Sequence, residues 1–218
     1  MTAPDFHTSP QTVPVSPERP LLIVDADEVL LRFAEGFEHF LKARALYLDL
    51  TSYRLHGNVK RQDDDSALID IEVTALLDEF RAELDSLEAV EHAREVLHEL
   101  MPLVQVVVLS NVSAAQAPAR LRNFAGLGFD FPLLVNSGPK GPAVRALARR
   151  GGRPCFFIDD IPHHIKSAAE HDPEVLRIHL IGDDRLKPLL PPAEHADLRA
   201  DSWREAGEFI RAAIAKGR

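Results

Sequence analysis

The chain has 218 residues, of which 45% are hydrophobic and 27% are charged, and its formal net charge is −9. This is the composition of a globular protein long enough to bury a core, and an acidic balance without a basic block argues against a general nucleic-acid binder. A single cysteine, Cys155, excludes an internal disulfide and a thiolate-rich metal site. No apolar run approaches the ~18 residues of a membrane span and no leader pattern opens the chain, so we expect a cytoplasmic protein without membrane contact.

Two carboxylates follow the first apolar run. Residues 1–19 are polar and rich in proline, which predicts a flexible arm without chemistry. The run from Leu21 to Val24 is short and partly β-branched, which predicts a buried strand, and it leads directly into Asp25 and Asp27. Residues two apart in a strand face the same side, and open α/β sheets bind ligands at the carboxyl ends of their strands.

A helical insertion is predicted next. Apolar residues with helical spacing occur over residues 33–48 and 69–84, and the stretch 51–65 between them is polar and irregular. We therefore expect a small all-helical cap over residues 34–86, between two parts of a core domain formed by residues 20–33 and 87–218. Polar cap residues that are candidates for substrate contact are Arg44, Arg54, His56, Lys60 and Arg61.

From there on, helical and strand patterns alternate. A helix is expected over residues 88–100, and apolar strands are expected at 104–109, 131–135, 155–158 and 175–181. Further helices are indicated by capping-box pairs at Ser113 with Gln116 and Ser202 with Glu205. Together with the first strand, this order predicts an α/β fold with a doubly wound, parallel, five-stranded sheet.

Polar residues stand near the ends of four of these strands. They are Asp25 and Asp27, then Ser110 and Asn111, then Lys140, and finally Asp159 and Asp160. Each group alone is most often a turn or a helix cap. The carboxyl ends of parallel strands lie on one edge of a sheet, so we expect the four groups to converge on one site.

These residue types suit phosphoryl transfer. Asp25 can attack phosphorus as a nucleophile, and Asp27, with a pKa raised by burial, can serve as general acid and base. Ser110 and the backbone near Asn111 can hydrogen-bond phosphoryl oxygens, and Lys140 can neutralise the developing charge.

The acidic groups also form a candidate metal site. Asp159 and Asp160, together with Asp25, offer hard oxygen ligands, which suit Mg²⁺ better than zinc. The negative net charge does not exclude a small phosphorylated metabolite as the partner, because such a ligand responds to the local field of the site.

The chain resembles the haloacid dehalogenase-like (HAD) hydrolase superfamily. Asp25 to Val29 matches its first motif, Asp-x-Asp-x-Thr/Val, Ser110 and Lys140 resemble the second and third, and Asp159 with Asp160 resembles the acidic fourth. The resemblance implies a Mg²⁺-dependent phosphatase with an aspartyl-phosphate intermediate and a C1-type cap at residues 34–86.

The same resemblance implies roles for individual acids. It implies metal ligation by the Asp25 side chain, the Asp27 backbone carbonyl and the fourth-motif acids, without deciding between Asp159 and Asp160. Dehalogenases of the superfamily lack an acid at the position of Asp27, because halide needs no proton, so Asp27 favours a phosphate ester. One departure is Glu28, where many relatives have glycine.

The sequence also bears on alternative functions. A receiver domain would place its lysine after the last strand, and neither a dinucleotide-binding glycine motif nor a P-loop is present. A catalytically weak HAD-like binding or regulatory protein, and a phosphotransferase of the mutase type, stay open, as do the substrate and the oligomeric state. His163 and His164 either touch the rim of the site or only begin a helix, and we favour the second interpretation.

Overall fold

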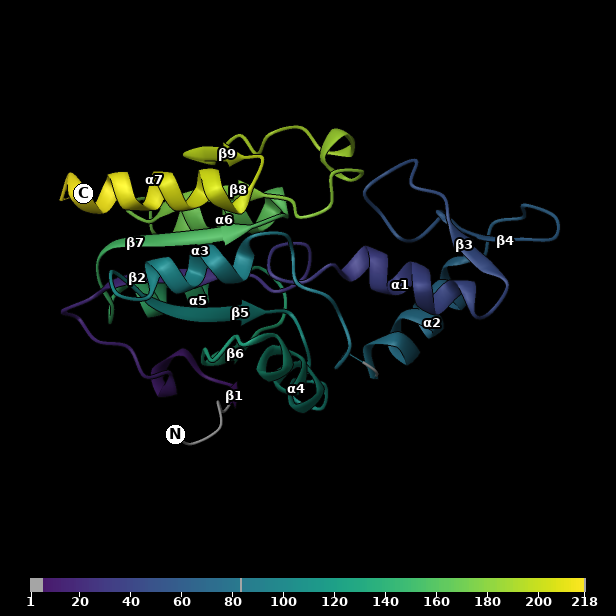
Figure 1. The fold of residues 1–218 in the computed structure, drawn as a ribbon, viewed down its shortest axis with the longest axis horizontal. Helices are drawn as coiled ribbons and strands as arrows, with labels where there is room; N and C mark the ends of the chain where they lie inside the picture. The colour runs from purple at the N-terminus through teal and green to yellow at the C-terminus, as the bar shows by residue number, and fades with distance from the viewer. Residues whose placement is uncertain (1–5, 83, 218) are drawn as a thin grey trace.

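The computed structural model describes residues 6–82 and 84–217, and within them a seven-stranded sheet forms the centre of the molecule (Figure 1). Its order is β1-β6-β5-β2-β7-β8-β9, and every neighbouring pair is parallel. The strands are β1 (Phe6–His7), β2 (Pro20–Val24), β5 (Gln105–Ser110), β6 (Leu133–Val135), β7 (Gly152–Asp159), β8 (Leu176–Leu180) and β9 (Leu198–Ala200). The helices of this part are α3 (Ala93–Leu100), α4 (Ala117–Leu127), α5 (Gly141–Ala148), α6 (Pro162–His171) and α7 (Trp203–Ala215).

Both faces of the sheet are covered by helices. In β2, Leu22 and Val24 belong to a core shared with α3, α4 and α7, whereas Leu21 and Ile23 belong to a second core shared with α5 and α6. Burial on both faces explains why the strands read as continuous apolar runs. The predicted doubly wound parallel sheet is therefore confirmed.

The sheet has two more strands than the five predicted. Both β1 and β9 are edge strands of two or three residues, too short to give an apolar pattern. The segment predicted to be a flexible arm contains β1, in which Phe6 pairs with Leu133. The side-chain amide of Gln105 donates to the carbonyls of Ser16 (2.6 Å) and Arg19 (2.8 Å). For residues 6–19 the prediction is wrong, because backbone groups of this segment bind the sheet edge; residues 1–5 lie outside the described part.

The cap segment, residues 34–86, is not all-helical. It contains α1 (Phe33–Lys42), β3 (Leu46–Leu48), β4 (Val59–Arg61) and α2 (Asp70–Ala82), and β3 and β4 pair as an antiparallel hairpin. Helical periodicity through Leu48 was misleading because Ala45, with φ +55°, turns the chain after α1. Phe37, Phe40 and Phe80 then pack together in the core of this segment, and Phe80 lies 5.3 Å from each of the other two ring centroids.

The two connections of the cap segment to the sheet are hydrogen-bonded to each other. Arg32 N donates to Glu88 O and Val90 N donates to Leu30 O, both at 2.9 Å. This pairing takes up residues 88–90, so the helix expected over 88–100 begins only at Ala93. The base of the cap segment is thereby held beside the end of β2.

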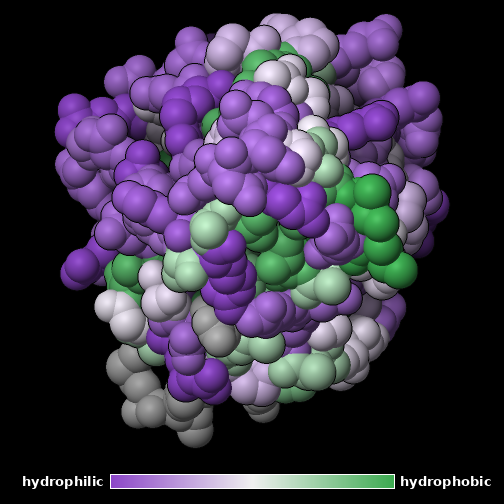
Figure 2. All heavy atoms as spheres, turned by 90° about the vertical axis from the view of Figure 1, so that its right-hand side faces the viewer, coloured by the Kyte–Doolittle hydropathy of each residue, from purple (hydrophilic) through white to green (hydrophobic). Residues whose placement is uncertain are grey.

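The cap segment projects beyond the carboxyl ends of β2, β5 and β7 (Figure 1). Seen from that side, the surface is mostly hydrophilic, with apolar side chains near its middle and one edge (Figure 2). In the described part of the chain, no helix is long and apolar enough to cross a membrane.

Candidate active site

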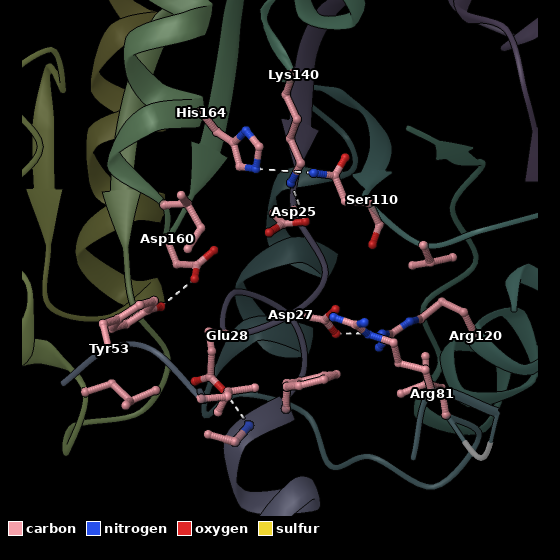
Figure 3. Close-up of a pocket in the computed structure, with 18 of the residues that line it drawn as sticks. Asp25, Asp27, Glu28, Tyr53, Arg81, Ser110, Arg120, Lys140, Asp160 and His164 are labelled. Atoms are coloured by element: carbon pink, nitrogen blue, oxygen red, sulfur yellow. Dashed lines mark hydrogen bonds and ion pairs between the residues drawn. The ribbon is translucent and has the colours of Figure 1, made fainter. Parts of the chain in front are cut away.

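Six of the seven polar residues predicted at the strand ends line one cavity of about 300 Å³, and Asp159 is the exception (Figure 3). Asp25 follows β2 directly, Ser110 is the last residue of β5, and Asp160 follows β7. Residues of the cap segment complete the lining on the opposite side. The carboxyl edge of the sheet thus forms the floor of the cavity, as expected for a doubly wound fold.

Lys140 lies at the centre of the floor. Its Nζ is 2.5 Å from Asp25 Oδ1 and 2.8 Å from Asp159 Oδ2, and the side chain is buried. Burial alone lowers the pKa of Lys140, but Asp159 and Asp25 outweigh it and raise this pKa. The next residue, Gly141, allows the close approach of α5 to α6, because a Cβ there would lie 2.2 Å from Ser167 O.

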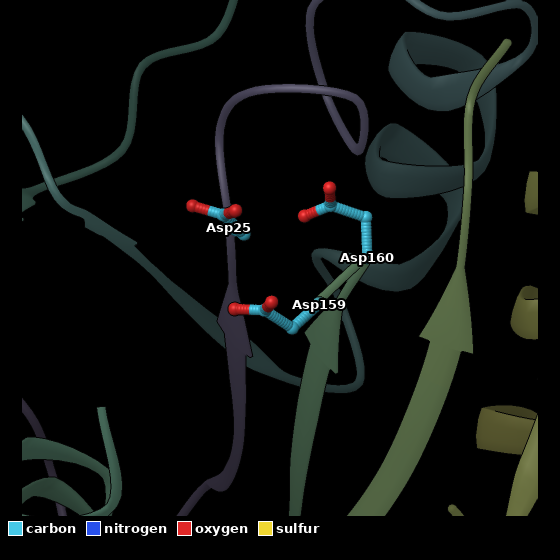
Figure 4. A group of neighbouring side chains, drawn as sticks. All are labelled: Asp25, Asp159 and Asp160. Carbon is cyan, nitrogen blue, oxygen red and sulfur yellow. The ribbon is translucent and has the colours of Figure 1, made fainter. Parts of the chain in front are cut away.

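Three buried carboxylates form a cluster at the floor of the site (Figure 4), and Lys140 is paired with two of them. One oxygen of each of Asp25, Asp159 and Asp160 lies within 4.8 Å of the others. Burial raises the pKa of all three carboxyls, and that of Asp160 rises well above its ordinary value, since Asp159 and Asp25 lie nearby. One ammonium does not balance three carboxylates, so the cluster fits a bound divalent cation with oxygen ligands.

The two fourth-motif acids have different surroundings. Asp159 accepts from Lys140 Nζ through Oδ2 and from Ile161 N through Oδ1 (2.9 Å), and it is fully buried. Asp160 lines the cavity, where its Oδ2 accepts a hydrogen bond from the Tyr53 hydroxyl. Asp160 is therefore the acid that faces the space above the sheet.

Asp27 is paired with an arginine that the sequence analysis missed. Arg120 Nη2 lies 2.6 Å from Asp27 Oδ1, and Arg120 is completely buried. Burial raises the pKa of Asp27, and the charge of Arg120 opposes that rise. A signal was present: Arg120 shares the buried face of α4 with Ala117 and Phe124, where a charged residue is unusual.

Asn111 supports the loop that leads to Lys140. Its side-chain amide donates to Gly138 O (3.1 Å), and its Oδ1 accepts from Asn136 Nδ2 (2.7 Å). The same amide nitrogen lies 3.3 Å from His164 Nε2. Ser110, buried beside it, lines the cavity with Asn111.

The favoured interpretation of the two histidines is wrong for one of them. Both belong to α6, but His164 is buried and lines the cavity, whereas His163 is exposed. Burial, followed by the charge of Lys140, lowers the pKa of His164 to about 3. His164 is therefore a neutral ring at the site.

The cap segment contributes residues other than those proposed from its polar sequence. Tyr53 and Arg81 line the cavity, together with apolar side chains. None of the five polar candidates at 44, 54, 56, 60 and 61 is among the described lining residues. Arg44, Arg54 and His56 are exposed. Lys60 and Arg61 are half-buried and form ion pairs with Asp49 and Glu72 within the cap segment.

Glu28, which departs from the motif, has an unusual backbone conformation and a buried side chain. Its φ is +58°, in the left-handed region that favours glycine. Its Oε1 accepts from Ala34 N at 2.6 Å, while Oε2 is buried and has no partner among the described residues. Burial raises the pKa of Glu28 to about 8.

Comparison with known proteins identifies the fold that carries this site. No family model and no curated protein sequence matches the chain. Solved structures match over nearly the whole length. A HAD-superfamily hydrolase, subfamily IA, from Geobacter sulfurreducens is 19% identical with a TM-score of 0.58, and the match covers 91% of this chain and 100% of that one. The chain has the haloacid dehalogenase-like fold.

Other haloacid dehalogenase-like structures agree with this assignment. A HAD family hydrolase from Deinococcus radiodurans with bound phosphate and sodium is 21% identical, with a TM-score of 0.57 and coverage of 92% of this chain and 97% of that one. A defluorinating L-2-haloacid dehalogenase is 12% identical, with a TM-score of 0.59 and coverage of 92% and 100%. Because these structures are at most 21% identical to the chain, the likeness establishes the fold, and the chemistry has to be argued from the site.

Proposed function

We propose that the protein is a Mg²⁺-dependent phosphatase that hydrolyses a small phosphomonoester through a phosphorylated Asp25. The observation that carries the proposal is the placement of a second carboxyl group, Asp27, in the same cavity as Asp25 and Lys140. A nucleophile that displaces an alcohol needs a proton donor for the leaving oxygen, and Asp27 supplies one.

In the first half of the reaction, a carboxylate oxygen of Asp25 forms a bond to phosphorus and the bond between phosphorus and the alcohol oxygen breaks. Protonated Asp27 gives its proton to that oxygen, so a neutral alcohol leaves. Burial raises the pKa of Asp27 toward the range that a general acid needs, and the charge of Arg120 opposes that rise. Lys140 and Ser110 stabilise the negative charge on the phosphoryl oxygens.

In the second half, Asp27 takes a proton from water as the water oxygen attacks phosphorus. The bond between phosphorus and Asp25 breaks, inorganic phosphate leaves and Asp27 is again protonated. The Asp25, Asp159 and Asp160 cluster, with the Asp27 backbone carbonyl, would hold Mg²⁺. Bound there, the ion would offset the carboxylate charge and withdraw charge from the phosphoryl group.

The test is release of inorganic phosphate from a panel of small phosphate esters, including p-nitrophenyl phosphate, with Mg²⁺ and with a chelator. We expect Mg²⁺-dependent turnover that falls at least about 1,000-fold in Asp25→Asn. Asp63→Asn, at an exposed position in the cap segment, is the matched control and should retain wild-type turnover. Mass spectrometry after acid quenching should locate a phosphoryl group on Asp25.

Other outcomes would assign a different function. Absence of turnover across the panel would favour a binding or regulatory protein. A phosphorylated Asp25 that is discharged by a sugar phosphate faster than by water would favour a phosphotransferase. Halide release from 2-chloropropionate would contradict the phosphatase proposal.

A further inference from the structure

The cavity contains an arginine that uses little of its hydrogen-bonding capacity. Arg120 is fully buried and donates from Nη2 to Asp27 at 2.6 Å. Its Nε and Nη1 are also buried, and neither has a hydrogen-bond partner among the described residues. A guanidinium is always charged and has five N–H donors, and buried donors without acceptors are unfavourable. Arg120 therefore offers donors for an acceptor that the described part of the chain does not supply.

The cap segment contributes a second arginine to the cavity. Arg81, from α2 of the cap segment, lines the same cavity, and Figure 3 shows both arginines pointing toward Asp27. Its ion pair is with Asp78 on its own helix, at 3.8 Å, and its side chain is 43% exposed. Asp78 is not among the residues that line the cavity, so on this side of the lining two guanidinium groups face one carboxylate, and positive charge is in excess there.

The opposite side of the cavity has the reverse charge. Asp25 and Asp160 lie there, and Lys140 is paired with Asp25 (Figure 3). The cavity is therefore polarised: the metal and phosphoryl positions belong to the acidic side, and Asp27 separates them from the two arginines.

The proposed reaction indicates which part of the substrate the two arginines face. Asp27 protonates the oxygen of the departing alcohol, so groups beyond Asp27 face the alcohol portion of the substrate. Arginine matches carboxylate and phosphate groups with paired N–H donors. We infer that Arg120 and Arg81 form a second anion subsite, and that the substrate is a phosphomonoester whose alcohol portion carries a carboxylate or a second phosphate. The inference rests on the proposed phosphatase function and narrows its substrate class.

The subsite requires movement of one side chain. Arg120 has no exposed surface in this state, so an anion reaches it only when neighbouring groups shift. Arg81 is the neighbour with room to move, because it is partly exposed and its ion pair with Asp78 is long. Since Arg81 belongs to the cap segment, binding of the second anion would link substrate recognition to the position of that segment.

The test compares three esters with the same carbon chain: propyl phosphate, 3-phosphonooxypropanoate and propane-1,3-diol bisphosphate. The kcat/KM for each anionic ester is divided by that for propyl phosphate, which cancels any general loss of catalysis through Asp27. We expect a ratio of at least about ten for one anionic ester in the wild type. The ester that gives it identifies carboxylate or phosphate as the second anion.

Variants test whether the preference for an anionic ester depends on the two arginines. In Arg81→Met and Arg120→Lys the ratio should fall at least about fivefold, since each removes part of the paired donor set. Arg122→Met is the matched control, because Arg122 is on the same helix, is 62% exposed and pairs with Asp85 outside the cavity. A ratio near one in the wild type, or an equal ratio in all variants, would overturn the inference and leave Arg120 as a counter-ion of Asp27 only.

Binding measurements separate this inference from the proposed function. Calorimetric titration of Asp25→Asn with the same three esters and Mg²⁺ measures Kd without turnover. If no ester is hydrolysed by the wild type, the phosphatase proposal fails; a preference for an anionic ester that disappears on adding Arg81→Met would still support the subsite. Equal Kd values for the three esters would reject the subsite whether or not turnover occurs.

Discussion

Lys140 Nζ lies 2.5 Å from Asp25 Oδ1, although the two residues belong to different βα units of the fold. The same ammonium is 2.8 Å from Asp159, so one buried cation holds the ends of β2 and β7 at a common point. A buried charge cluster of this kind orients the candidate nucleophile before any substrate binds.

Replacing this lysine tests its double role. In Lys140→Met, we expect kcat to fall by about 100-fold or more, and the free energy of unfolding to fall by about 3–5 kcal/mol, because buried carboxylates lose their cation. Phosphate release and urea denaturation measure the two effects. Lys166→Met, at a 60% exposed position on α6, is the control and should change neither. Activity within about threefold of wild type would contradict the assigned role.

Asp27→Asn separates the two halves of the reaction. With alkyl phosphates, we expect kcat to fall about 100- to 10,000-fold, because the leaving alkoxide is not protonated. With p-nitrophenyl phosphate, whose leaving group needs no proton, a rapid burst of nitrophenol followed by slow turnover is expected, since water is no longer deprotonated. Stopped-flow absorbance measures the burst. Equal losses for both substrates without a burst would show that Asp27 is not the general acid.

Metal binding should stabilise the fold through the acidic cluster. At a hundredfold excess over Kd, we expect Mg²⁺ to raise Tm by roughly 5–10 °C, because it binds the folded carboxylates and not the unfolded chain. The shift should be largely lost in Asp160→Asn, which removes the acid that faces the cavity. Differential scanning fluorimetry with K⁺ at equal ionic strength is the control. A shift that is the same in wild type and Asp160→Asn would reject this cluster as the metal site.

The lowered pKa of buried His164 predicts that the free energy of unfolding decreases in acid. Burial lowers the pKa of His164 from 6.5 to about 3, so as the pH falls below 6.5 the unfolded chain takes up a proton before the folded chain does. The contribution is fully present above pH 6.5 and is lost as the pH falls toward 3. In His164→Gln, the decrease in unfolding free energy between pH 7.5 and pH 4.5 should be smaller by roughly 1–3 kcal/mol.

Denaturant titrations at the two pH values measure this difference. His98→Gln, at an exposed position on α3, is the control and should follow the wild type. If His164→Gln loses as much stability in acid as the wild type does, the ring is not held neutral by its surroundings.

The floor of the site was predictable because it depends on strand ends. Asp25, Ser110 and Lys140 each follow or end an apolar strand, and parallel strands place such residues on one edge regardless of the details of packing. The walls were not predictable in this way. Arg120 and His164 lie within helices and Tyr53 lies in the cap segment, so their approach to the cavity depends on how those elements pack.

The sequence by itself determined the doubly wound parallel sheet, the central strands and the acidic residues at their ends, because burial on two faces leaves a local apolar pattern. Only the tertiary structure decided that residues 46–61 form a hairpin, that β1 joins the sheet edge, that Asp160 rather than Asp159 faces the cavity, and that Arg120 pairs with Asp27. Those outcomes depend on contacts between segments distant in the chain, which local periodicity does not encode.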